Sequence, residues 1–157
     1  MASLAEPAFP GDDGSVDPAL AQALAAYDSD CSLAPVLVAL GTARVIVPVV
    51  AVRGEAAVGS DKEADMATVM MTGADGRRAL LAFSGLESLQ RWQADARPVP
   101  VWAREAARAA LAEGATALLL DLAGPVRAIV ETDDLQHLAN GDELVAVGPS
   151  WAWTGSA

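Results

Sequence analysis

Lys62 is the only lysine of the chain, and it lies in the acidic stretch DKEADMA that covers residues 61–67. An ammonium group at this spacing can hold the carboxylate of Asp65, or a carboxylate of a partner protein. The same composition is also typical of a solvated surface loop. Lys62, Asp65 and Met66 are therefore candidate binding residues, with a solvated loop as the alternative interpretation.

Arg77 and Arg78 are a second pair of candidates, at the start of a predicted strand. Guanidinium groups bind carboxylates and phosphates, so two adjacent arginines can serve a polar ligand or a partner surface. An enzyme acting on a small metabolite such as an amino acid would need a pocket that holds two or more of Lys62, Asp65, Arg77, Arg78 and Asp121, and the absence of such a pocket would remove this alternative.

Trp151 and Trp153 are the third group of candidates, two residues apart near the C-terminus. An extended chain places both indoles on the same side. Aromatic side chains are enriched at recognition surfaces, so these tryptophans can form a docking site. The alternative is that the segment packs back onto its own domain.

A catalytic or metal-binding set is not evident in this sequence. His137 is the only histidine and Cys31 the only cysteine, so zinc sites and Ser-His-Asp or Cys-His arrangements lack the necessary side chains. We expect Cys31 to be a small buried apolar residue and His137 a surface or capping residue. Ser84 is predicted to cap a helix, not to act as a nucleophile. We predict a non-enzyme with no cofactor and no metal.

Composition and charge exclude several partners. The chain has 157 residues with 53% hydrophobic and 20% charged side chains, which is typical of one globular domain. Ten basic and twenty-one acidic residues give a net charge of −11, which repels nucleic acids and anionic membranes. A single cysteine fits a reducing compartment, and the arginine-rich, alanine-rich composition is typical of a high-GC genome. We expect a cytoplasmic protein that binds neither nucleic acid nor membrane.

The apolar stretch of residues 33–52 is the one segment that resembles a membrane span, but Pro35, Gly41, Arg44 and Pro48 interrupt it. A charge such as Arg44 at the bilayer centre costs about 2.5–3.5 kcal/mol. A buried helix over residues 32–43 followed by a strand over 44–52 is the better interpretation. Pro48 cannot donate a hydrogen bond within a sheet, so it predicts an edge strand or a bulge there.

The remaining elements alternate between helices and strands. Helices are predicted over residues 18–27, 84–93, 102–113 and 133–139, and strands over 65–72, 77–83, 116–121, 126–131 and 143–147. Asp75-Gly76 marks a tight hairpin turn, and Ser84 with Glu87 fits a capping box. Asp17 is predicted to cap the first helix. In the helix over 102–113, one face is predicted to consist of Ala103, Ala106, Ala107 and Ala110. Hairpins with helices between them predict an α+β fold, in which helices pack on a single layer of mostly antiparallel or mixed sheet. We predict a flexible tail over residues 1–16, a domain over 17–148 and a tryptophan-containing tail over 149–157.

Five stretches in order resemble one known family. They are RVIVPVV from Arg44, DKEADMA from Asp61, GRRALLAFS from Gly76, RPVPV from Arg97 and LLLDLAGP from Leu118. Together they are similar to the N-terminal domain of the SseB-like, enhanced-serine-sensitivity proteins, over roughly residues 17–140. Ser84 and Leu122 depart from the family, which often has Thr and Pro there. The resemblance implies an α+β fold in a cytoplasmic bacterial protein, and it implies no reaction.

These observations rank three functions. A non-enzymatic protein-binding or adaptor module comes first, because the polar segment around Lys62 and the terminal tryptophans are its candidate surfaces. A structural homo-oligomer comes second, motivated by the edge strand expected at Pro48. A small-molecule-binding protein or an enzyme, acting on an amino-acid-related compound, comes third.

Overall fold

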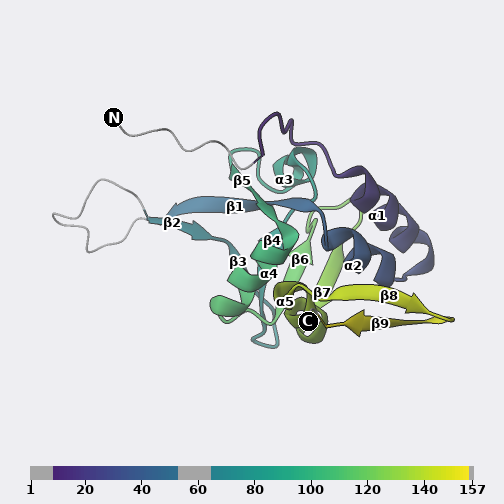
Figure 1. Cartoon of the computed structure of the whole chain (residues 1–157). Coiled ribbons are helices and arrows are strands. Elements are labelled where there is room, and N and C mark those ends of the chain that lie inside the picture. Colours follow the sequence, from purple (N-terminus) through teal and green to yellow (C-terminus); the bar gives the residue numbers. More distant parts are fainter. Residues whose placement is uncertain (1–8, 53–64, 156–157) are drawn as a thin grey trace, which may run out of the picture.

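A computed structural model of the chain describes residues 9–52 and 65–155. Within these residues the strands form three small, mostly antiparallel sheets, and helices pack on them (Figure 1). This arrangement confirms the predicted α+β class. The prediction expected one layer of sheet, but the strands are divided between separate sheets. The chain passes from the first sheet to the second at Val69, and a bridge between Ile46 and Phe83 joins these two sheets.

The first sheet is antiparallel in the order β2-β1-β5. Its strands are β1 (Arg44–Val52), β2 (Asp65–Thr68) and β5 (Arg97–Trp102). Because β1 is flanked on both sides, the edge strand predicted at Pro48 is wrong, and the register with β5 runs through Pro48 without the bulge given as the alternative.

The position of Pro48 within β1 explains why a central strand tolerates a proline. Ile46 exchanges two backbone hydrogen bonds of 2.7 Å with Phe83, and alternation along a strand points the nitrogen of Pro48 to the same side. On that side β2 begins to pair only at Val49. The proline nitrogen, which has no hydrogen to donate, therefore falls in the gap between Phe83 and β2.

The second sheet has the order β3-β4-β6-β7, and only β4 and β6 are parallel. Its strands are β3 (Met70–Thr72), β4 (Arg78–Ala82), β6 (Ala117–Leu120) and β7 (Ala128–Glu131). The predicted hairpin turn is confirmed, with Gly76 at φ +84°. The predicted strand over 65–72 is two strands, since Val69 separates β2 from β3 and accepts a hydrogen bond from Leu81.

Five helices of the described residues surround these sheets: α1 (Pro18–Asp30), α2 (Ala34–Leu40), α3 (Leu86–Trp92), α4 (Ala103–Ala112) and α5 (Thr132–Asn140). Asp17 caps α1 as predicted, accepting hydrogen bonds from Ala19 N and Leu20 N. The apolar stretch of residues 33–52 forms α2 and β1, in agreement with the predicted helix and strand. Nowhere in residues 9–52 and 65–155 does a helix have the length and apolarity needed to cross a membrane.

The main core lies between one face of the second sheet, β1, and the helices α1, α2, α4 and α5. The alanine face predicted for α4 is buried there, through Ala103, Ala106, Ala107 and Ala110. A smaller core lies on the opposite face of the second sheet, where α3 covers Phe83 and Leu81. Strands that bury both faces must be apolar throughout, and the fully buried LLL of β6 meets this requirement.

The C-terminal residues form a third, two-stranded sheet of β8 (Glu143–Val147) and β9 (Ser150–Thr154). The prediction of a separate tail from residue 149 is therefore wrong for residues 150–154. Gly148, at φ +59°, allows the chain to reverse into a hairpin. The hairpin lies beside α2 and α5 (Figure 1).

Candidate functional site

Two polar residues meet where the parallel strands β4 and β6 end. Ala82 pairs with Leu120, and each strand then continues into the loop that carries Ser84 or Asp121. The carboxyl ends of parallel strands lie at the same edge of a sheet, which brings these two residues together. The backbone N–H of Asp121 donates to Ala82 O at 3.0 Å and fixes the register.

The Asp121 carboxyl group is 2% exposed, and Ser84 binds both of its oxygens. The backbone N–H of Ser84 donates to Oδ1 at 2.8 Å, and its hydroxyl donates to Oδ2 at 2.6 Å. Burial raises the pKa of Asp121, and the hydrogen bonds from Ser84 and Ser88 only partly oppose this effect. Asp121 also has φ +55°, a left-handed conformation that is uncommon outside glycine.

The capping box predicted from Ser84 and Glu87 is wrong, because the hydroxyl of Ser84 is bound to Asp121. Helix α3 begins one residue later, with Gly85 as its N-cap. Ser88 takes the reciprocal role, accepting from Gly85 N at 3.3 Å and donating to Gly85 O at 2.9 Å. The residues around Ser84 do not indicate that Asp121, thirty-seven residues away, binds the Ser84 hydroxyl in place of the backbone of the helix.

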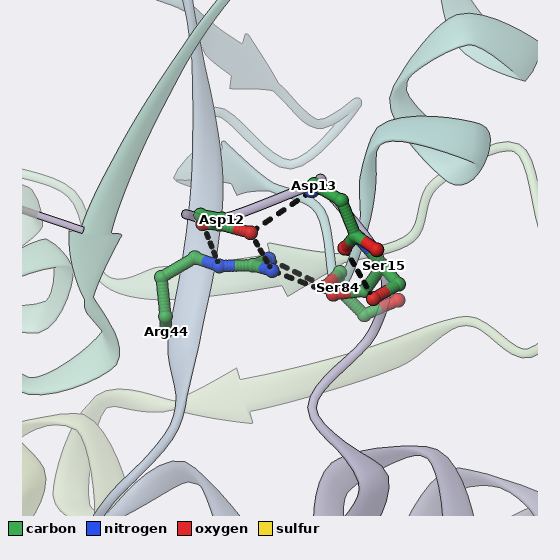
Figure 2. A network of polar contacts seen from close by, with 6 residues as sticks. Asp12, Asp13, Ser15, Arg44 and Ser84 are labelled. Atoms are coloured by element: carbon green, nitrogen blue, oxygen red, sulfur yellow. Dashed lines mark hydrogen bonds and ion pairs between the residues drawn. The ribbon is translucent and has the colours of Figure 1, made fainter. Parts of the chain in front are cut away.

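The N-terminal segment forms one side of this site, held there by Arg44 (Figure 2). The Arg44 guanidinium binds both carboxylate oxygens of Asp12 at 2.8 and 2.9 Å and donates to Ser15 O at 2.5 Å and Ser84 O at 3.1 Å. The flexible tail predicted for residues 1–16 is therefore wrong for residues 9–16, and residues 1–8 lie outside the described part. Gly85 allows the close approach, since a Cβ there would lie 2.9 Å from Val16 and 3.0 Å from Gly14 O.

A cavity of about 230 Å³ opens above Asp121. Its floor is polar, and its walls are mostly aliphatic side chains of α1 and of the loop that follows β6. Glu87 and Arg91 of α3 form an ion pair of 3.3 Å beside it. The residues that line the cavity are Val16, Ala21, Leu24, Ala25, Ser84, Glu87, Ser88, Arg91, Asp121, Pro125 and Val126.

A second and larger cavity, of about 470 Å³, is a groove between α1, α2 and the C-terminal hairpin. Trp151 and Leu144 form its hairpin side, and Trp151 remains 45% exposed. Val38 of α2 lies in the same groove and is 44% exposed. The other lining residues come from the two helices and are Ala19, Gln22, Ala23, Ala26, Pro35 and Ala39.

Trp153 has a different environment from Trp151, although both face the same side of β9 as predicted. Its indole N–H donates to Asp134 Oδ1 at 3.0 Å, and its ring stacks on His137 at 4.9 Å between centroids. His137 in turn contacts Asp142 Oδ2 at 2.7 Å. Trp153 therefore attaches the hairpin to α5, and Trp151 is the one of the two whose surface is available for a partner.

Arg77 and Arg78 line a third, smaller depression of about 190 Å³ with Met71 and Ile129. Arg77 forms an ion pair with Glu131, and that hydrogen bond raises the pKa of Arg77. Arg78 donates to Glu113 O at 3.3 Å. Both arginines thus have partners within the chain. The depression holds two of the five residues named for an enzyme, so the pocket criterion does not remove that alternative, while Asp121 lies in the first cavity.

The remaining candidates are only partly described. Lys62 lies outside the described residues. Asp65 and Met66 belong to β2, where they pair with Val52 and Ala51 of β1. The hypothesis that residues 61–67 form a binding site therefore stays a prediction.

Cys31 is exposed, which corrects the expectation of a buried residue. It ends α1 with φ 58°, and its backbone N–H donates to Tyr27 O at 2.9 Å. The left-handed conformation of the C-cap turns its side chain outward. In the described part of the chain, no three of the His, Cys, Asp and Glu residues are grouped so that they could hold a metal ion.

The Ser84–Asp121 pair was missed by the sequence analysis as a site. The position of each residue in the sequence could have indicated this pair. Ser84 follows the short apolar run LLAF, and Asp121 follows the run LLL. Polar residues at the carboxyl ends of buried strands are frequent at binding sites of α/β sheets. The periodicity of the strands does not show which two ends are neighbours.

The fold defines a small α+β domain with cavities at the ends of β4 and β6 and beside the C-terminal hairpin. The chain belongs to the SseB family, since the model of the SseB protein N-terminal domain matches residues 20–137. The match ends within α5, so the C-terminal hairpin lies beyond it. No curated protein and no solved structure matches the chain.

Proposed function

We propose that this protein is a non-enzymatic protein-binding module, and that the groove between α1, α2 and the C-terminal hairpin is its docking site. The observation that carries the proposal is the half-exposed Trp151 at the edge of an apolar groove of about 470 Å³. Tryptophan is enriched among residues that dominate binding energy at interfaces. Gln22 is the only polar side chain among the residues that line the groove.

The occupant that fits is a segment with a large apolar side chain between lysines or arginines. The apolar side chain would bury Val38 and Trp151, which are 44% and 45% exposed. The basic flanks follow from charge, because the net charge of −11 attracts cationic partners. Asp28 and Asp30 in the last turn of α1 add carboxylates at the helix end, where the helix dipole is also negative.

The cytoplasm is the proposed place of action. The single cysteine of the sequence forms no intramolecular disulfide, and its thiol is exposed. An exposed free thiol is compatible with a reducing compartment. His137, the single histidine, is engaged by Asp142 and Trp153, which supports a role in attaching the hairpin instead of one in catalysis.

The experiment begins by identifying the partner segment. A photo-crosslinking amino acid in place of Val38 captures whatever occupies the groove in the source cells, and mass spectrometry of the crosslinked peptide gives its sequence. We expect an apolar side chain flanked by Lys or Arg. A synthetic peptide of that sequence is then titrated against the full chain by calorimetry.

Trp102 provides a matched control for Trp151, because it is 47% exposed but lies at the end of β5. Trp151→Ala should weaken peptide binding at least about tenfold, and Trp102→Ala should change it less than about twofold. Equal effects of the two substitutions would contradict the proposal. So would crosslinks only to a second copy of the chain, which would favour the homo-oligomer.

A further inference from the structure

The Asp121 carboxylate lies on the floor of its cavity without a cationic partner. Among the described residues no Lys, Arg or His forms an ion pair with it. A carboxylate has about four acceptor positions; Ser84 fills two of them and the hydroxyl of Ser88 bears on a third, so at least one position is left for a donor from outside. A buried, ionised carboxylate without a counter-charge is costly, so a cation supplied from outside would be strongly favoured there.

The walls of the cavity set the shape of the group that carries this cation. Leu24 and Ala25 of α1 line the cavity together with Pro125 and Val126 of the loop that follows β6. These surfaces are aliphatic, so they favour a chain of methylene groups over a hydrated metal ion. The volume of about 230 Å³ is below the roughly 300–1,000 Å³ that is usual for drug-sized ligands, which indicates a small group.

The mouth of the cavity does not oppose a cation. Arg91 is paired with Glu87, so the two charges of α3 largely cancel. The net charge of −11 also raises the local concentration of cations around the protein. A ligand carboxylate, in contrast, would meet the Asp121 carboxylate directly and be repelled.

We propose that this cavity binds a primary alkylammonium group, with the ammonium hydrogen-bonded to Asp121 and the methylene chain packed along Leu24 and Val126. The group occurs in small aliphatic amines and in the side chain of lysine. An ammonium has three N–H donors, of which one or two would reach the Asp121 carboxylate and another the hydroxyl of Ser88. The site is separate from the Trp151 groove, and neither proposal depends on the other.

The test is a titration followed by NMR, with the backbone amides of Ser84 and Ser88 as reporters, because Ser84 N–H donates directly to Asp121. The first probes are n-butylamine and n-butanol, which share a chain and differ in charge at neutral pH. The second pair is Nα-acetyl-lysine amide and Nα-acetyl-norleucine amide. We expect saturable shifts with the amines and at least tenfold weaker binding of the two neutral probes.

The two pairs of probes also distinguish the source of the group. Binding of n-butylamine alone indicates a free amine, because the cavity then excludes the backbone of lysine. Binding of both amines indicates that a lysine side chain also fits. Equal shifts with charged and neutral probes, or no saturable shift with either amine, would overturn the proposal.

Two variants test the two parts of the proposed site, which are the Asp121 carboxylate and the aliphatic wall of the cavity. Asp121→Asn removes the charge and should weaken n-butylamine binding at least tenfold, with Asp95→Asn, an exposed carboxylate, as the matched control. Ala25→Leu fills the cavity from the exposed side of α1 and leaves Asp121 and its hydrogen bonds in place. It should also abolish the shifts, and it keeps the test valid if Asp121→Asn does not fold. Undiminished binding in Ala25→Leu would overturn the proposal.

Discussion

The pair of Ser84 and Asp121 joins two loops that are far apart in the sequence. Asp121 accepts both the backbone N–H and the hydroxyl of Ser84, so a single carboxylate fixes the end of β4 against the end of β6. Arg44 adds a third connection by binding the carbonyl of Ser84 together with Asp12 and Ser15 O. The loops and the N-terminal segment are thus held by charge-assisted hydrogen bonds, which are stronger than neutral ones.

The raised pKa of Asp121 predicts how this residue affects stability across pH. The unfolded pKa of an aspartate is about 3.9, and burial raises the folded value above it. The folded protein therefore holds the proton over a range where the unfolded chain has lost it. The contribution of Asp121 to the free energy of unfolding is largest below the unfolded pKa and falls as pH rises through the folded pKa.

Urea unfolding of wild type and Asp121→Asn at several values between about pH 4 and pH 7 measures this contribution. The free energy of unfolding of wild type minus that of the variant should decrease as pH rises. Asp95→Asn controls for the loss of one acidic group at the surface. A difference that grows with pH would show that the hydrogen bonds from Ser84 and Ser88 outweigh the burial.

At the level of elements, α4 is attached to its neighbours by arginines and not only by its alanine face. Arg104 donates to Gly41 O at 2.9 Å, Leu138 O at 2.9 Å and Asp142 O at 2.8 Å. Arg108 donates to Ala139 O at 2.9 Å. These carbonyls lie at the ends of α2 and α5, where the helix dipole is negative and the last carbonyls lack partners within the helix.

Arg104→Ala should lower the free energy of unfolding by about 2–4 kcal/mol, because three charge-assisted hydrogen bonds are lost at once, although Leu138 O keeps the N–H of Gly141. Arg108→Ala, which removes one such bond, should cost about 1 kcal/mol. The control is Arg127→Ala, an exposed arginine of the loop before β7, with an expected change within about 0.5 kcal/mol. Urea unfolding measures all three, and equal effects of Arg104→Ala and Arg127→Ala would contradict the assignment.

The C-terminal hairpin is attached to α5 through Trp153 and to the main core through Leu144. Trp153 binds Asp134 and stacks on His137, both of α5, and Leu144 packs against the main core. This attachment positions Trp151 over the groove, since the two tryptophans face the same side of β9. The docking surface proposed for this protein thus depends on a hairpin that lies beyond the match to the SseB domain.

For the whole molecule, the edges of the sheets and the net charge both bear on self-association. Strand β5 is an edge of the first sheet, and it carries Pro98 opposite Pro48 and Pro100 opposite Ile46. Alternation turns the nitrogens of Pro98 and Pro100 toward the open edge, where neither can donate to another strand. A homo-oligomer was expected because Pro48 was predicted to lie in an edge strand. That reason no longer supports it, because β1, which contains Pro48, is the central strand of the first sheet.

The net charge predicts that moderate salt stabilises the protein. Twenty-one acidic residues against ten basic ones give 10 − 21 = −11, so repulsion within the folded chain exceeds attraction. Raising sodium chloride from about 10 mM to about 0.3 M should increase the free energy of unfolding by on the order of 1 kcal/mol. Urea unfolding at neutral pH checks this. A decrease would mean that ion pairs such as Arg44 with Asp12 contribute more than the overall repulsion costs.

The sequence by itself determined the local elements and the class of the fold. The alanine face of α4, the Asp-Gly turn between β3 and β4, and the cap of α1 at Asp17 all depend on interactions within a few residues, and each was predicted. The resemblance to the SseB family also rested on the order of local stretches. The family match over residues 20–137 confirms it.

Only the tertiary structure decided which distant residues meet. Ser84 was predicted to cap a helix, because its nearest partners in sequence suited that role, but Asp121 arrives from a neighbouring strand and takes its hydroxyl. Pro48 was assigned to an edge, because a sequence does not show that a gap opens between Phe83 and β2. Pairing between strands, and hence the cavities at their ends, depends on long-range contacts that no local pattern of residues encodes.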